Sequence, residues 1–156
     1  MAINLSTAGI QLLYCVEATK GTRPTSGYTR IYGAKSTPSL NPSPETLETT
    51  TLDETEYKTY IDGLKDLGGA LEFTFNLTEE LIGKWDDLMS AYETGKAQNK
   101  ATWFAIVIPG LTDAFYFPGN PSAMGLPETA VNSVLEITNY ITPTGAPVKA
   151  AKPTGE

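Results

Sequence analysis

The segment Thr102–Ile108 (TWFAIVI) places apolar side chains on both faces if it forms a β-strand, because successive side chains point to opposite sides. Such a strand must be covered on both faces, so it belongs at the centre of a sheet. By contrast, Leu71–Leu77 alternates between apolar and polar residues, which is typical of a strand with one face in the core. The sequence therefore predicts a β domain whose central strand is covered from two sides.

One amphipathic helix is predicted directly after Leu77. Thr78 is a suitable N-cap, Gly95 is the expected stop, and the small Gly83 is expected to allow close packing of the helix. Apolar residues at helical spacing form a stripe that would face the sheet: Leu81, Ile82, Trp85, Leu88, Met89 and Tyr92.

Further strands are indicated by a composition that includes 22 threonines, eight tyrosines and five phenylalanines in 156 residues. The length fits a single domain. The expected additional strands are Thr7–Glu17, Thr29–Lys35, Leu47–Leu52, Asp113–Phe117 and Val131–Ile141. Gly119–Pro127 is expected to be a loop, and Pro143–Glu156, poor in large apolar side chains, a flexible C-terminal tail.

Several classes of chemistry are excluded by the composition. The chain has no histidine and one cysteine, which excludes a Ser-His-Asp triad, a histidine-ligated metal and an intrachain disulfide. The formal net charge of -7 argues against a general affinity for nucleic acid. No segment is long and apolar enough to span a membrane, and Met1–Thr7 carries no positive charge, so synthesis in the cytoplasm without a signal peptide is expected. No catalytic residue, cofactor or metal is expected.

Weaker candidates for chemistry have simpler explanations. The carboxylates of Asp53, Glu54 and Glu56, or of Asp86 and Asp87, are in supply for acid–base work, but a solvated charged surface explains them better. Cys15 is expected to be a buried small apolar residue. Core packing likewise explains the aromatic residues that could bind a sugar, which are Trp85, Tyr92 and Trp103.

The charge distribution is more informative than the total. Residues 18–44 carry a net charge of +4 and residues 45–66 a net charge of -5. These charges either are screened within one subunit or join the basic segment of one subunit to the acidic segment of the next, in a contact that propagates. The residues hypothesised to make such contacts between subunits or rings are Lys20, Arg23, Arg30, Lys35, Asp53, Glu54, Glu56 and Lys58.

Long stretches of the sequence resemble the tail tube proteins (major tail proteins) of siphophages that infect Gram-positive bacteria. The resemblance covers roughly Met1 to Gly145. It is carried by MAINLSTAG, LETTTLDETEYKTYIDGLKDLGGALEFTFN, TEELIGKWDDLMSAYETGKAQNKATWFAIVIPG and SVLEITNYITPTG.

This resemblance implies a mainly β fold, an antiparallel β-sandwich or barrel with one flanking α-helix, spanning residues 1–142. In that family, six copies form a ring, and stacked rings enclose a channel through which viral DNA passes without sequence-specific binding. An N-terminal arm, here about residues 1–7, and a long loop, here the acidic segment of about residues 41–66, commonly reach a neighbouring subunit or ring. The implied partners are further copies of the chain, a tape-measure protein in the lumen, and tail tip (initiator) and terminator proteins. The implied location is the virion tail, after assembly in the host cytoplasm.

Other functions stay open at the level of sequence. The chain could be a monomeric immunoglobulin-like or carbohydrate-binding surface module. It could also be a type VI secretion or pyocin-type tube subunit, since the sequence does not show whether a contractile sheath surrounds the tube. A hydrolase that relies on carboxylates alone is a more remote alternative.

Overall fold

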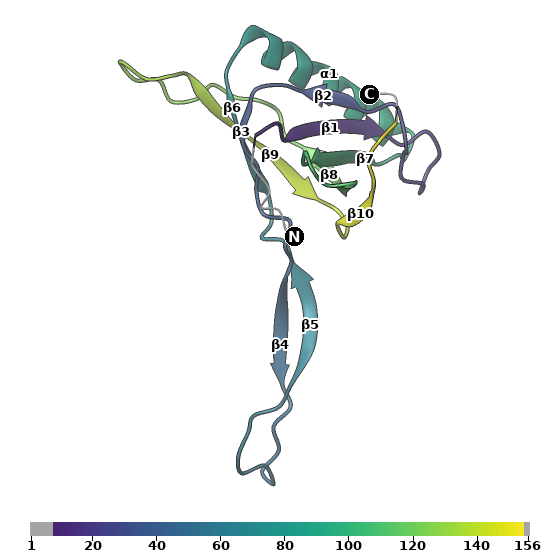
Figure 1. Ribbon diagram of the computed structural model, residues 1–156, viewed down its shortest axis with the longest axis vertical. Helices are drawn as coiled ribbons and strands as arrows, with labels where there is room; N and C mark the ends of the chain where they lie inside the picture. Colours follow the sequence, from purple (N-terminus) through teal and green to yellow (C-terminus); the bar gives the residue numbers. More distant parts are fainter. Residues whose placement is uncertain (1–7, 155–156) are drawn as a thin grey trace.

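The computed structural model describes residues 8–154 of the chain, and the expected N-terminal arm at residues 1–7 lies outside this part. Its elements in chain order are β1 (Gln11–Val16), β2 (Thr29–Ile31), β3 (Ala34–Ser36), β4 (Ser43–Glu48), β5 (Tyr60–Asp66), β6 (Leu71–Asn76), α1 (Glu79–Ala97), β7 (Thr102–Val107), β8 (Asp113–Pro121), β9 (Glu136–Pro143) and β10 (Val148–Ala151). Eight strands form one sheet in the order β2-β1-β7-β8-β9-β6-β3, with β10 beside β8. The strands β4 and β5 form a separate two-stranded sheet that extends away from the rest (Figure 1).

The large sheet is strongly curled. Its edge strands β2 and β3 stand at opposite ends of the strand order, yet only Tyr32 and Gly33 separate them in the chain. Three residue steps span at most about 10 Å, so the two edges come close together. The Asn76 backbone N–H donates a hydrogen bond to the Gly33 carbonyl at 3.1 Å, which holds this crossing against β6. The predicted mainly β fold with one flanking helix is confirmed, as a curled antiparallel half-barrel.

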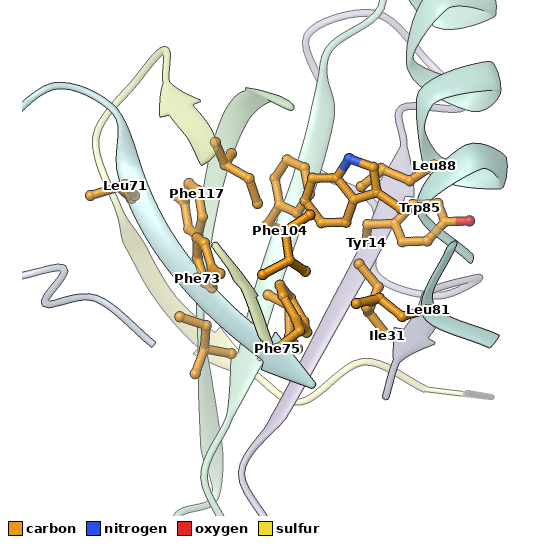
Figure 2. Packing of buried hydrophobic residues seen from close by; sticks show 14 residues of the cluster. Tyr14, Ile31, Leu71, Phe73, Phe75, Leu81, Trp85, Leu88, Phe104 and Phe117 are labelled. Atoms are coloured by element: carbon orange, nitrogen blue, oxygen red, sulfur yellow. The ribbon is translucent and has the colours of Figure 1, made fainter. Parts of the chain in front are cut away.

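The main core lies between the sheet and α1. The buried side of α1 presents Leu81, Trp85 and Leu88, all at most 2% exposed, to aromatic residues of the sheet (Figure 2). Trp85 meets Phe75 edge-on at 6.0 Å between ring centroids, and its Nε1–H donates a hydrogen bond to the Ser122 carbonyl at 2.9 Å. The predicted stripe is therefore correct at its centre, while Ile82 is 43% exposed.

A second, smaller core covers the opposite face of the sheet. It contains Leu13, Tyr28, Ala105, Val107, Ala114 and Tyr116, with Ala150 of β10 packed against it. Because Phe104 and Ile106 belong to the main core, β7 is buried on both faces. The two-sided cover predicted for this strand is confirmed.

The segment predicted to be a flexible C-terminal tail contains a strand. β10 pairs antiparallel with β8, with Val148 opposite Tyr116 and Ala151 opposite Asp113. Thr154 also forms a parallel bridge with Ser26. The prediction is therefore wrong for this part of the tail, because backbone pairing with β8 orders a segment that has few large apolar side chains of its own.

Some predicted boundaries also differ from the structure. β8 continues to Pro121 rather than ending at Phe117, because Gly119–Pro121 pairs with the end of β9. β9 begins at Glu136 rather than Val131, and α1 continues to Ala97 rather than stopping at Gly95. The predicted acidic loop at residues 41–66 is largely the hairpin of β4 and β5.

Candidate interaction surfaces

The hairpin β4–β5 is held together mainly by its own backbone and by threonine side chains. Leu47 lies opposite Ile61 in its register. At the end of the two strands, the Thr49 N–H donates to the Thr59 carbonyl at 2.8 Å, and the Thr59 N–H donates to Thr50 Oγ1 at 2.9 Å. These bonds extend the pairing of the two strands up to a loop of acidic residues, whereas at the other end the register shifts between Pro44 and Thr46.

The hairpin exposes apolar side chains that a globular domain would normally bury. Leu47 and Ile61, which share one face, are 47% and 55% exposed. Further exposed apolar residues of the hairpin are Leu52, Tyr57, Tyr60 and Leu64. A two-stranded sheet alone is marginally stable in water, and an exposed apolar surface on such a projection is typical of an interaction site.

The tip of the hairpin carries the three acidic residues named in the sequence analysis. Asp53, Glu54 and Glu56 are all exposed, and within residues 8–154 none of them forms an ion pair. Lys58, also named there, lies 4.0 Å from the Glu48 carboxylate across the hairpin. The negative charge at the tip is therefore uncompensated within the described chain.

Three of the four basic residues predicted to form a contact surface have partners in their own subunit. The Arg23 guanidinium lies 4.3 Å from the centre of the Tyr116 ring, and that of Arg30 lies 4.4 Å from the centre of the Tyr32 ring. Lys35 forms an ion pair with Glu136 at the start of β9. The fourth residue, Lys20, is exposed in the loop after β1. The structure thus does not gather the four into one free basic surface.

Arg23 belongs to a cluster of side chains at the smaller core, on the face of the sheet opposite α1. The Tyr28 hydroxyl donates to the Pro24 carbonyl at 2.9 Å, and the Tyr116 hydroxyl donates to the Ala151 carbonyl at 2.6 Å. Burial raises the pKa of both tyrosines above the ordinary value, an effect that the nearby Arg23 guanidinium partly offsets. Both hydroxyls therefore remain protonated donors that tie the loop after β1, and β10, to the sheet.

A group of lysines at the end of α1 was not predicted from the sequence. Lys96 and Lys100 line the same hollow as Lys20, together with Tyr92 and Asn99. The signal that could have revealed it is the lysine spacing at the C-terminal end of α1, but the approach of Lys20 depends on the tertiary fold.

The residues considered for catalysis or sugar binding lie at the surface or in the core. No cluster of potential metal ligands is found among the described residues. Asp86 and Asp87 are exposed on α1, and burial raises the pKa of the half-buried Cys15 thiol, which disfavours the reactive thiolate. Trp85 is fully buried in the core, so it is inaccessible to a glycan.

The other two aromatic candidates, Trp103 and Tyr92, are not fully buried, and Tyr92 lines the hollow near Lys96 rather than the core. Trp103 is half-buried, and its Nε1–H donates to the buried Glu17 carboxylate at 3.3 Å. Among residues 8–154, no helix is long and apolar enough to cross a membrane.

Comparison with known proteins gives a structural match without a sequence match. No protein-family model matches the chain, and no curated protein matches it in sequence. The fold is similar to that of a chain in the cryo-EM structure of the anti-feeding prophage (AFP) baseplate, which was six-fold symmetrised. The TM-score is 0.59 at 9% sequence identity, and the match covers 97% of this chain and 98% of that chain. At this identity, the likeness shows a shared fold over nearly the whole length of both chains.

Proposed function

We propose that this protein is a structural subunit of a phage tail tube, which acts by assembling into stacked, six-membered rings around a channel for DNA. The observation that carries this proposal is the hairpin β4–β5. It projects from the half-barrel as a separate two-stranded sheet (Figure 1), and it exposes apolar side chains. A projection of this kind gains stability when it is covered by a neighbouring subunit.

The structural similarity supports the same class of assembly. The AFP baseplate chain shares the fold over almost its full length and comes from a six-fold symmetrised complex. The sequence resemblance to siphophage tail tube proteins adds the tube itself, with a tape-measure protein in the lumen and initiator and terminator proteins at its ends. The proposed location is the virion tail, with assembly in the host cytoplasm.

The charge of the chain fits a conduit for DNA. The formal net charge is -7, and carboxylates on a channel wall repel phosphates, so a duplex can slide without adhering. In this proposal the protein has no enzymatic activity and needs no cofactor. Its function is to form, with other copies of itself, the wall of the channel.

A second candidate is a baseplate subunit, which the AFP likeness favours directly. The two functions differ in how growth ends. A tube subunit stacks ring upon ring, whereas a baseplate subunit forms a ring of fixed composition. A tube of the type VI or pyocin kind would stack like the first candidate, inside a contractile sheath.

Electron microscopy of the purified protein tests the proposal. We expect rings at moderate concentration and tubes of variable length after prolonged incubation, or after addition of the tail proteins that start assembly. Rings that never stack would favour the baseplate subunit. Persistent monomers at high concentration, even with tail proteins supplied, would contradict both candidates.

A further inference from the structure

An open hollow of about 420 Å³ lies where α1 ends and the loop after β1 passes. Its wall includes three lysines, Lys20, Lys96 and Lys100, together with Tyr92 and Asn99. None of the described residues that line it is acidic, and none of the three lysines forms an ion pair within residues 8–154. The hollow therefore concentrates positive charge on a protein whose net charge is negative.

The backbone around the hollow is well fixed. The Lys100 N–H donates to the Gly95 carbonyl at 2.8 Å, and Asn99 adopts the left-handed conformation that ends the helix, with a φ of 57°. These contacts hold Lys96 and Lys100 on either side of one tight turn.

The carboxylate of Glu17, which is bonded to Ala101 in the wall of the hollow, is already engaged. Glu17 is only 5% exposed, and its carboxylate accepts hydrogen bonds from the Ala101 backbone N–H at 2.8 Å and from the Trp103 indole. It is therefore turned to the backbone and the indole, and it forms no ion pair with the lysines within the described chain.

We infer that Lys20, Lys96 and Lys100 form the docking site for the acidic hairpin tip of a second copy of this chain. The tip presents Asp53, Glu54 and Glu56, which are exposed and unpaired within the described chain, so three negative charges match three positive ones. This inference rests on the proposed function and names the surface that receives the hairpin.

The arrangement of the subunit directs this contact to a neighbour. The hairpin extends away from the half-barrel, whereas α1 lies on the far side of the half-barrel from the tip (Figure 1). The acidic tip and the lysine hollow are therefore different surfaces at different places on the subunit. A contact between two different surfaces is heterologous and repeats from copy to copy, as the stacking of rings requires.

A charge-swap experiment tests the docking site. The lysine variant K20E/K96E/K100E and the tip variant D53K/E54K/E56K should each raise the concentration needed for tube formation at least about tenfold, since like charges then meet. A chain that carries all six substitutions keeps the net charge at -7 and should recover most of the assembly. The matched control K84E/K149E/K152E changes the net charge by the same amount as the lysine variant and should assemble like the wild type.

Folding is checked separately for each variant by circular dichroism and thermal unfolding. Lys100 is half-buried, so K20E/K96E, which changes two exposed lysines only, provides a second test if the triple variant unfolds. Two results would overturn the inference and leave the proposed function intact. One is normal assembly of K20E/K96E; the other is a chain with all six substitutions that folds but does not assemble. Failure of the wild-type protein to assemble would overturn both.

Cross-linking locates the contact independently of its strength. Chains with Glu54→Cys are mixed with chains with Lys96→Cys, assembled, and treated with a short bifunctional maleimide; Cys15 remains in both. The expected product is a covalent dimer of one chain of each kind, absent when Lys149→Cys replaces Lys96→Cys. Assembled tubes without this dimer would contradict the inference. If the lysine variants assembled normally but bound added double-stranded DNA more weakly than the wild type, the lysines would be a nucleic-acid site instead, which would also contradict it.

Discussion

Val16 of β1 and Gly95 near the end of α1 lie so close together that a Cβ atom on Gly95 would be 2.6 Å from Val16 Cγ1. This distance is well inside van der Waals contact, so only glycine fits without displacing the valine. The contact holds the last turns of α1 against β1 and so helps to position Lys96 and Lys100. Gly83, in the middle of the same helix, has no atom within 4 Å of a hypothetical Cβ.

The two helical glycines should respond oppositely to alanine. Gly83→Ala should stabilise the protein by about 0.5–1 kcal/mol, because alanine is the better helix former and meets no neighbour there. Gly95→Ala should destabilise it by about 1 kcal/mol, because the cost of the clash with Val16 exceeds the same gain. Urea unfolding of both variants measures the difference; a stabilising Gly95→Ala would show that β1 and α1 are not packed as described.

The close packing predicted at Gly83 occurs at Gly95 instead, and the spacing of the two glycines from the buried residues of α1 accounts for this. Gly83 lies two residues from both Leu81 and Trp85, which places it on the opposite side of the helix from the buried stripe. Gly95 lies seven residues, about two turns, after the buried Leu88, and so on the same side. A close contact was therefore predictable at Gly95, whereas its partner Val16 was not.

Local patterns predicted the helix and most strands of the large sheet, but they missed β5 and β10, which were expected to be loop and tail. Contacts between residues far apart in the sequence were not predictable from such patterns. The two-sided burial of β7 was predictable because its apolar residues are consecutive in the sequence. The ion pair between Lys35 and Glu136 was not, since it depends on strand order within the sheet. For the same reason, the charges along the chain did not reveal that Arg23 lies over the Tyr116 ring, or that Lys20 comes close to Lys96 and Lys100.

Trp85 should be the most sensitive position on α1. It is fully buried, packs edge-on against Phe75, and donates a hydrogen bond to the Ser122 carbonyl. Trp85→Phe should cost about 1–2 kcal/mol, mainly from the unpaired carbonyl, and Trp85→Ala about 3–5 kcal/mol from the cavity. Denaturant unfolding followed by circular dichroism gives both values. Equal losses for the two variants would show that the hydrogen bond, and not the ring, dominates.

Alkaline pH should destabilise the folded protein. Burial raises the pKa of Tyr14, Tyr28 and Tyr116 above the ordinary value, so they ionise earlier in the unfolded chain than in the folded one. A raised folded pKa contributes stability that is complete below about pH 10, the value of a free tyrosine, and is lost as the pH rises further. Urea unfolding between roughly pH 9 and 11 measures the slope. The variant Tyr28→Phe/Tyr116→Phe should be less stable at neutral pH, but its stability should fall less steeply; an unchanged slope would contradict the assignment.

The paired residues Leu47 and Ile61 should matter for assembly and not for the subunit. Both are about half exposed on the hairpin, so the variant Leu47→Ser/Ile61→Ser should change the free energy of unfolding by less than about 0.5 kcal/mol. It should nevertheless abolish tubes in electron microscopy at concentrations where the wild type forms them, because the apolar face that a neighbour covers is lost. The control Ile82→Ser/Val148→Ser removes two comparably exposed apolar side chains away from the hairpin and should still assemble. If both variants lose assembly equally, general surface hydrophobicity, and not the hairpin, drives the association.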